Sequence, residues 1–307
     1  MKTKFAFIMF IFLGSLFASN LNLFSPIDEP KDLNTTKVLL GRLLFTDKLL
    51  SIDGTISCAS CHDGMGFGVD NAKTSTGVKN QKGDINAPTT FNARYHFAQF
   101  HDGRAKDLKE QASGPLTNPI EMGNSLEGVL KSVKKNNFYI VTFSKLYPDG
   151  ITVDNILDAI AEFEKALVTP SRFDDYLKGD KNALRDIEIE GLELFKSYGC
   201  VACHNGINIG GNLFAKLGVL KDYKGSSLGR YNVTKDEDDK NYFRVPTLRN
   251  INWTNPYLHD GTIKELNECV GFMGEYQFGT KLPKDDIKKI EAFLHSLTGR
   301  VPSVTKG

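Results

Sequence analysis

The chain has 307 residues, of which 40% are hydrophobic and 24% are charged, and its formal net charge at pH 7 is +1. This is the composition of a globular protein long enough for two domains with separate cores, and it excludes an intrinsically disordered chain. The balanced charge also excludes a strongly basic protein, so we expect no nucleic-acid partner.

The first 18 residues have the pattern of a secretory signal peptide. Lys2 and Lys4 precede a short apolar run over residues 5–17, and the small residue Ala18 follows it. The run is shorter than a membrane-spanning helix requires, but Leu16 is large for the position before a cleavage site, so a membrane anchor stays open as the alternative. We predict export to the periplasm.

Residues 36–48 place apolar side chains at helical spacing and lead into the sequence Cys58-Ala59-Ser60-Cys61-His62. Residues 64–83 are rich in Gly, Asn, Lys, Ser and Thr and predict a long loop. Helices are then predicted over 102–112, 126–136 and 153–168. The Pro, Gly and charged residues of 170–182 indicate a boundary between two domains.

The second half repeats this order. Residues 184–198 predict a helix that leads into Cys200-Val201-Ala202-Cys203-His204, and helices over 263–272 and 284–297 follow. No region is rich in strand signals, so the predicted class is mainly α, with two cytochrome c-like domains packed against each other. We expect these domains to cover 19–169 and 170–297, with the tail at about 298–307 joining the first.

Each C-x-x-C-H motif has the pattern that attaches a c-type haem covalently. One copy alone would also fit a disulfide, half of a zinc site or chance, but two complete copies argue against these alternatives. The predicted attachment and axial residues are Cys58, Cys61 and His62 in the first motif and Cys200, Cys203 and His204 in the second. The fifth cysteine, Cys269, is predicted to be a small buried apolar side chain.

The ligand opposite each histidine decides whether a haem transfers electrons or binds a substrate, because only an open iron position can bind one. Met273 follows the second motif and precedes the last helix, where a thioether ligand opposite His204 is expected; the alternative is a core side chain. No methionine is equally well placed for the first haem, because Met65 is too near His62 and Met122 stands beside a glutamate.

If the sixth position of the first haem is open, splitting a peroxide there requires a general base and polar hydrogen-bond donors. Glu121 and Gln111 have suitable chemistry. Their spacing alone does not distinguish them from other acids and amides in the chain.

The resemblance to a known family rests on the stretches CASCH, NAPTTFNARYHFAQFHDGRAKDLKEQASGPLTNPIEM, GCVACH, FRVPTLRNI, NPYLHDG and FMGEYQFGTKL. Through these motifs, residues 39–299 resemble the bacterial di-haem cytochrome c peroxidases. The resemblance implies that the N-terminal haem reduces peroxide and that the C-terminal haem, ligated by His204 and Met273, is the high-potential entry point for electrons. It also implies hydrogen peroxide as substrate, a small periplasmic cytochrome c or similar carrier as donor, and a homodimer.

The same resemblance implies roles for individual residues. Glu121 matches the acid–base residue, Gln111 the active-site amide, and His259 a residue beside the haems that does not bind iron. A calcium ion between the domains is implied by the side chain of Asn86 and the backbone oxygens of Thr254 and Pro256. Hard oxygen ligands of this kind suit Ca²⁺.

Two positions depart from the family pattern. The histidine that binds the first haem in many oxidised family members follows T-S-x-G, and here that position is Val78, which cannot bind iron. We therefore expect the first haem to rest without this ligand, with His96 or Lys79 as candidate substitutes. The family's tryptophan between the haems is His101 here, which either takes part in inter-haem electron transfer or fills the space.

Two other functions remain as alternatives. One is a MauG-type di-haem oxidase that modifies a partner protein, but that group has a tyrosine at the position of Met273. The other is a di-haem electron carrier without catalysis, which leaves the Glu121-Met122 motif unexplained.

Overall fold

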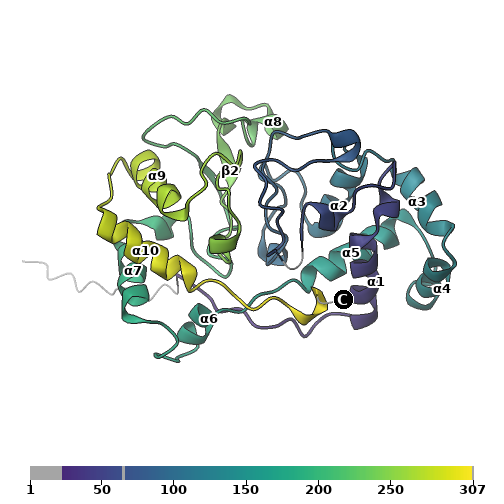
Figure 1. Cartoon of the computed structure of the whole chain (residues 1–307), viewed down its shortest axis with the longest axis horizontal. Coiled ribbons are helices and arrows are strands. Elements are labelled where there is room, and N and C mark those ends of the chain that lie inside the picture. The colour runs from purple at the N-terminus through teal and green to yellow at the C-terminus, as the bar shows by residue number, and fades with distance from the viewer. Residues whose placement is uncertain (1–22, 64–65, 306–307) are drawn as a thin grey trace, which may run out of the picture.

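The computed structural model describes residues 23–63 and 66–305, so the predicted signal peptide over residues 1–18 and Met65 lie outside the described residues. Figure 1 shows two halves side by side, with the early helices in one and the late helices in the other. Helices predominate in both halves, which confirms the predicted mainly α class. No helix in the described part of the chain is long and apolar enough to cross a membrane.

The helices of the first half are α1 (Thr35–Thr46), α2 (Leu108–Thr117), α3 (Leu126–Lys134), α4 (Asn137–Leu146) and α5 (Val153–Lys165). Those of the second half are α6 (Arg172–Leu177), α7 (Asp186–Ser197), α8 (Tyr231–Thr234), α9 (Leu266–Phe278) and α10 (Lys284–His295). Strands β1 (Phe214–Lys216) and β2 (Tyr242–Arg244) pair antiparallel, with Ala215 opposite Phe243.

Local capping explains several differences from the predicted helices. Helix α2 begins at Leu108 instead of 102, because the side chain of Asp107 accepts a hydrogen bond from the backbone of Glu110 and caps the helix. Helix α6 lies inside 170–182, where Ser171 and Asp174 form a capping box. Helix α4 is absent from the sequence prediction, and α9 continues past residue 272.

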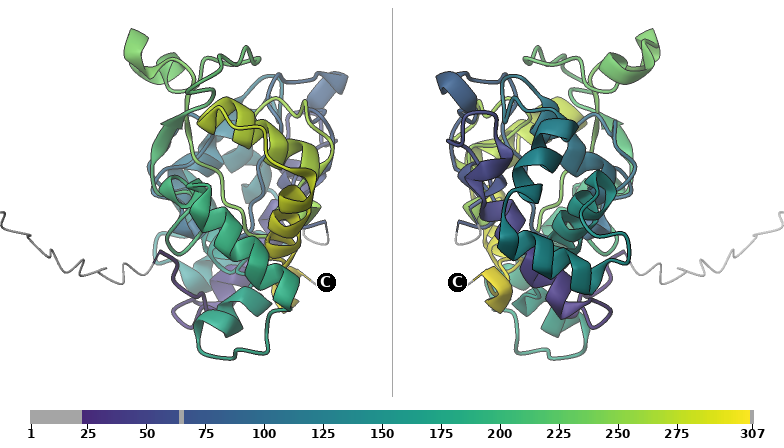
Figure 2. Two further views of the ribbon diagram at one scale, coloured as in Figure 1. Left: turned by 90° about the vertical axis from the view of Figure 1, so that its left-hand side faces the viewer. Right: turned by 90° about the vertical axis from the view of Figure 1, so that its right-hand side faces the viewer.

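Each half is built on a crossed helix pair, α1 with α5 and α7 with α10, which the end views of Figure 2 show. Both crossings require glycine, because a Cβ at Gly41 would collide with the carbonyl oxygen of Ala159, and a Cβ at Gly191 with that of Lys289. The repeated order of sequence elements is therefore a repeated packing.

The halves have separate hydrophobic cores, and the ends of the described chain cross between them. Phe24 is buried in the second core, where its ring packs edge-on against Phe173 at 5.4 Å between centroids. Val301 and Val304 pack against the first core. Figure 1 shows both end segments running between the halves. The domain boundaries stay a prediction. Phe24, which belongs to the first predicted domain, packs in the core of the second half.

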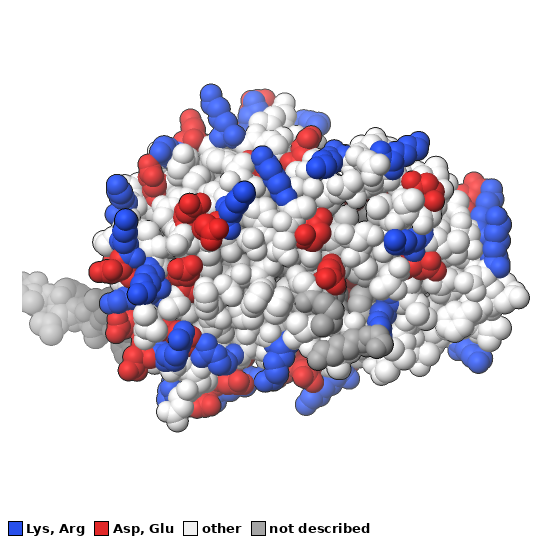
Figure 3. Space-filling view, in the orientation of Figure 1, with Lys and Arg blue, Asp and Glu red and all other residues white. Residues whose placement is uncertain are grey.

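Charged side chains of both signs are interspersed over the face shown in Figure 3. Several form exposed or partly exposed ion pairs, such as Lys221 with Glu275 at 2.6 Å and Lys289 with Glu190 at 2.7 Å. Exposed pairs of this kind contribute little to stability, about 0 to 1 kcal/mol each. The cores and the buried polar contacts therefore hold the halves together.

Candidate active site

A cavity of about 360 Å³ lies beside the first C-x-x-C-H motif. Cys58, Cys61 and His62 line it, together with Gln111 from α2 and Glu121 from the turn that follows α2. The fold thus gathers around one cavity the residues that the sequence analysis assigned to the first haem and to acid–base chemistry.

The histidine of the first motif is held in one tautomer. Its Nδ1 lies 3.0 Å from the carbonyl oxygen of Gly68. Because a carbonyl oxygen only accepts hydrogen bonds, Nδ1 of His62 carries the proton and Nε2 keeps its lone pair. Burial lowers the pKa of His62, which keeps the ring neutral. A neutral imidazole with a free Nε2 is the form that binds haem iron.

Glu121 is a partly buried carboxyl with one direct partner. Asn118 donates a hydrogen bond from Nδ2 to its Oε1 at 2.6 Å, and Asn118 also lines the cavity. Burial raises the pKa of Glu121, while the Asn118 hydrogen bond and the charge of Arg104 oppose that rise. A carboxyl with a raised pKa can both take up and return a proton. The sequence analysis did not select Asn118, although its spacing of three residues before Glu121 was a usable signal.

Phe100 and Arg104 complete this part of the wall, and Arg104 was not selected from the sequence. The Arg104 guanidinium lies 3.5 Å from the centroid of the Phe100 ring, and its Nη1 pairs with Asp102 at 2.8 Å. Phe100 has a left-handed backbone with φ of 67°, and a Cβ at Gly114 would lie 2.8 Å from its ring. These contacts hold an aromatic ring and a cation at the cavity.

The loop that departs from the family pattern packs directly on Glu121. The backbone N–H of Val78 donates to the carbonyl oxygen of Glu121 at 2.8 Å. Val78 is only 1% exposed and packs toward Gly123, while Ser75 and Gly77 line the cavity. Of the two candidate substitute ligands, His96 is buried and lines the cavity, whereas Lys79 is exposed.

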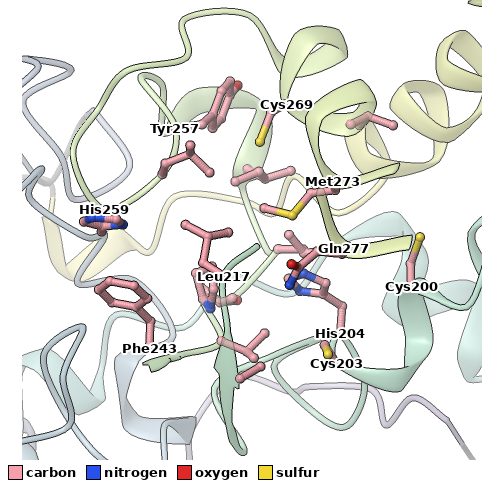
Figure 4. Close-up of a pocket in the computed structure, with 18 of the residues that line it drawn as sticks. Cys200, Cys203, His204, Leu217, Phe243, Tyr257, His259, Cys269, Met273 and Gln277 are labelled. Atoms are coloured by element: carbon pink, nitrogen blue, oxygen red, sulfur yellow. The ribbon is translucent and has the colours of Figure 1, made fainter. Parts of the chain in front are cut away.

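A second cavity, of about 300 Å³, lies beside the second motif. Cys200, Cys203 and His204 line it, and Met273 reaches it from α9, as Figure 4 shows. Burial lowers the pKa of His204 to about 4, so this imidazole is also neutral. Cys269 is partly buried and lines the same cavity.

His101 and Arg244 line both cavities and therefore lie between the two sites. Nε2 of His101 is 3.2 Å from the carbonyl oxygen of Asn86, and burial lowers the pKa of His101 to about 3. His259 stacks on Phe243, with the ring centroids 4.2 Å apart. Of the two cavities, His259 lines only the second.

The three residues named for calcium all line the second cavity. Asn86 donates from Nδ2 to the carbonyl oxygen of Ala72 at 2.9 Å, which leaves its Oδ1 as an acceptor. The part of the chain that the structure describes contains no cluster of three or more His, Cys, Asp or Glu side chains suited to a metal. A cation near Thr254 and Pro256 would therefore be bound by amide and backbone oxygens.

Comparison with known proteins identifies the family. Residues 35–182 match the family model described as di-haem cytochrome c peroxidase. A cytochrome c551 peroxidase of Nitrosomonas europaea is 48% identical over 94% of this chain and 90% of that protein. The chain belongs to the di-haem cytochrome c peroxidase family. A cytochrome c peroxidase of Escherichia coli is 46% identical over 89% of this chain, which spans 60% of that longer protein.

A comparison with solved structures agrees with the predicted fold. A MauG-like protein associated with microbial copper homeostasis superposes with a TM-score of 0.81 and 26% identity, covering 95% of this chain and 97% of that one. The peroxidase therefore has the fold of two cytochrome c-like domains, and it is an oxidoreductase with two haem groups.

The residues around both cavities fit such groups. Each cavity has two thiols that would attach a haem and a neutral histidine that would bind its iron. Between the cavities, Nη1 of Arg244 is buried without a hydrogen-bond partner among the described residues. A buried guanidinium requires an anion, and haem carboxylates would supply one.

Proposed function

We propose that the first cavity is the site where hydrogen peroxide is reduced, with Glu121 as acid–base residue and Gln111 as hydrogen-bond donor. The observation that carries this proposal is the gathering of Glu121 and Gln111 on the wall of the cavity that contains His62. When bound, the haem supplies the redox chemistry that a side chain cannot. The overall reaction is H₂O₂ + 2 electrons + 2 protons to 2 H₂O.

The chain's own groups would move the protons. Glu121 takes a proton from one peroxide oxygen and returns it to the departing oxygen, as a general base and then a general acid. The Gln111 amide donates a hydrogen bond to the oxygen on which negative charge develops. Asn118 holds Oε1 of Glu121, so the other carboxylate oxygen is the one left to act.

Electrons would enter at the second haem, ligated by His204 and Met273, because a thioether ligand raises the reduction potential. Their source would be a small periplasmic cytochrome c or an equivalent single-electron carrier. His101, which lines both cavities, stands on the path between them. We further propose a periplasmic homodimer with one Ca²⁺ held by Asn86, Thr254 and Pro256.

A MauG-type oxidase is the second candidate, supported by the likeness to a MauG-like protein of known structure. Met273 argues against it, because the resemblance implies a tyrosine at that position in MauG-type oxidases. A non-catalytic carrier would leave the carboxyl of Glu121 and the amide of Gln111 on the wall of the first cavity without a use.

Steady-state reduction of hydrogen peroxide by the purified di-haem protein, with a reduced cytochrome c as donor, separates these functions. We expect turnover in the wild type and a loss of about 10²- to 10⁴-fold in Glu121→Gln. Glu127→Gln is the matched control, since Glu127 is exposed and paired with Lys131 at 2.7 Å. Absence of turnover with both haems present would refute the peroxidase reading.

A further inference from the structure

Glu164, in the last turn of α5, is a second carboxyl on the wall of the first cavity. Its residue is 4% exposed, and its Oε2 is fully buried with no hydrogen-bond partner among the described residues. A buried carboxyl without a partner is costly, and folds retain one where it does chemical work more often than elsewhere. Neither the acid–base role proposed for Glu121 nor the hydrogen bond proposed for Gln111 uses it.

The repeated helix crossing provides an internal comparison for this position. Ala159 contacts Gly41 in the first crossing as Lys289 contacts Gly191 in the second, so each residue of α5 has a counterpart in α10. Glu164 lies five residues after Ala159, and Leu294 lies five residues after Lys289. Leu294 is 3% exposed and lines the second cavity as Glu164 lines the first. An apolar side chain therefore suffices at this place in the fold, and the carboxyl is specific to the first haem.

Four basic side chains on the elements packed around α5 form ion pairs with acidic groups other than Glu164. Lys37 on α1 pairs with Asp158, and Lys109 on α2 pairs with Asp154. Arg94, beside α5, pairs with Asp32, and Lys131 on α3 pairs with Glu127. Burial raises the pKa of Glu164 to about 8. The other ionisable groups on the cavity wall are Cys58, Cys61, His62, Asp84, His96, His101, Asp102, Arg104, Glu121 and Arg244.

We propose that Glu164 is a positioning residue for charge at the first haem. The Glu164 carboxylate binds one proton when that haem gains one electron. In this step the electron comes from the second haem, the proton comes from bulk solvent, and the Glu164 carboxylate becomes a carboxylic acid. The physical reason is that an added negative charge in a buried site is costly unless a proton accompanies it. The positive charge of the oxidised iron favours the carboxylate, and its loss on reduction favours the acid.

This inference rests on the proposed function, because it assumes that the first haem receives electrons from the second. It predicts that the reduction potential of the first haem falls as pH rises through the neutral range. It also predicts that the second haem, which has Leu294 at the matching position, shows no comparable dependence there. The second haem therefore serves as an internal control in the same molecule.

The test is a redox titration of the two haems by absorption spectroscopy, at several pH values, in the wild-type di-haem protein and in variants. Glu164→Gln keeps the side-chain shape, and Glu164→Leu copies the second half. We expect both variants to lose most of the pH dependence of the first haem while the second haem is unchanged. Bound haem content, measured by absorption, verifies that each variant has folded.

An unchanged pH dependence in both variants would overturn the proposal. A dependence that persists in Glu164→Gln but vanishes in Glu121→Gln would assign the proton to Glu121 and overturn it as well. The titration needs no turnover, so its result stands apart from the peroxide assay. If the wild type does not reduce peroxide, the proposed function is wrong. If it reduces peroxide but the variants keep the pH dependence of the first haem, only the role of Glu164 is wrong.

Discussion

The side chain of Asn118 donates a hydrogen bond of 2.6 Å to Oε1 of Glu121. This bond stabilises the carboxylate form, so it limits how far burial raises the pKa of Glu121. Both side chains line the first cavity. The protonation of the proposed acid–base residue is therefore set by a neighbour three positions away.

Replacing Asn118 by alanine should move the acid limb of the pH–rate profile upward. A general base must be deprotonated, so the rate of peroxide reduction rises with pH through the pKa of Glu121. Loss of a hydrogen bond to a charged group raises that pKa, and we expect a shift of about one pH unit or more. Asn124→Ala, in the next turn, is the control. An acid limb that stays in place would contradict the role given to Asn118.

The oxidised first haem should contain a high-spin component. Val78 stands where many family members have a loop histidine that binds the first haem. Its side chain cannot bind iron, and it is buried against Gly123. We expect electron paramagnetic resonance of the fully oxidised protein to show one high-spin and one low-spin haem, and peroxide reduction to begin without prior reduction. Two purely low-spin signals would show that another ligand, such as His96, occupies the position.

Met273→His should lower the reduction potential of the second haem. An imidazole in place of a thioether removes the ligand that raises the potential, so the haem becomes a poorer acceptor of electrons from the donor. Spectroscopic redox titration measures the change. Met122→Leu is the control, because Met122 lines the first cavity and not the second. Equal potentials in Met273→His and wild type would exclude Met273 as an iron ligand.

Exchange of His101 for phenylalanine tests the path between the haems. His101 lines both cavities and contacts the backbone of Asn86 through Nε2. If it takes part in electron transfer, rapid-mixing kinetics will show slower oxidation of the second haem after peroxide is added. His295→Phe, at the exposed end of α10, serves as the comparison. An unchanged rate would mean that His101 only fills space.

A fully buried ion pair should dominate the stability of the second half. Arg249 binds Asp174 at two points, with Nη1 and Nη2 each 2.9 Å from a carboxylate oxygen. Asp174 also accepts from the backbone of Ile27 at 2.8 Å, so it ties the N-terminal segment to this half. Removal of one partner leaves a buried charge, and we expect Asp174→Ala to lower the free energy of unfolding by about 3 to 5 kcal/mol.

Urea unfolding followed by circular dichroism measures this change. Glu193→Ala breaks an exposed pair with Lys196 and should cost less than about 1 kcal/mol. Equal losses of unfolding free energy in the two variants would show that the buried pair contributes no more to stability than the exposed pair.

Contiguous residues determined the features that depend on local chemistry and periodicity. The two C-x-x-C-H motifs carry their attachment residues within five positions, so the number of haems was readable directly. Apolar spacing located α1, α3, α5, α7 and α10 within a few residues, because a helix buries one face at a period of 3.6. The start of α2 was misplaced because the capping side chain of Asp107 decides it, and α6, which a capping box of Ser171 and Asp174 begins, was missed entirely.

Tertiary structure alone decided the features that depend on segments far apart in the chain. The sequence named His62 and Glu121, but only the fold placed them on one cavity and added Asn118 and Arg104. The contrast between Glu164 and Leu294 likewise appears only once the two helix crossings are matched through Gly41 and Gly191. The physical reason is that burial and proximity set a pKa or an open ligand position, and neither is a property of a residue by itself.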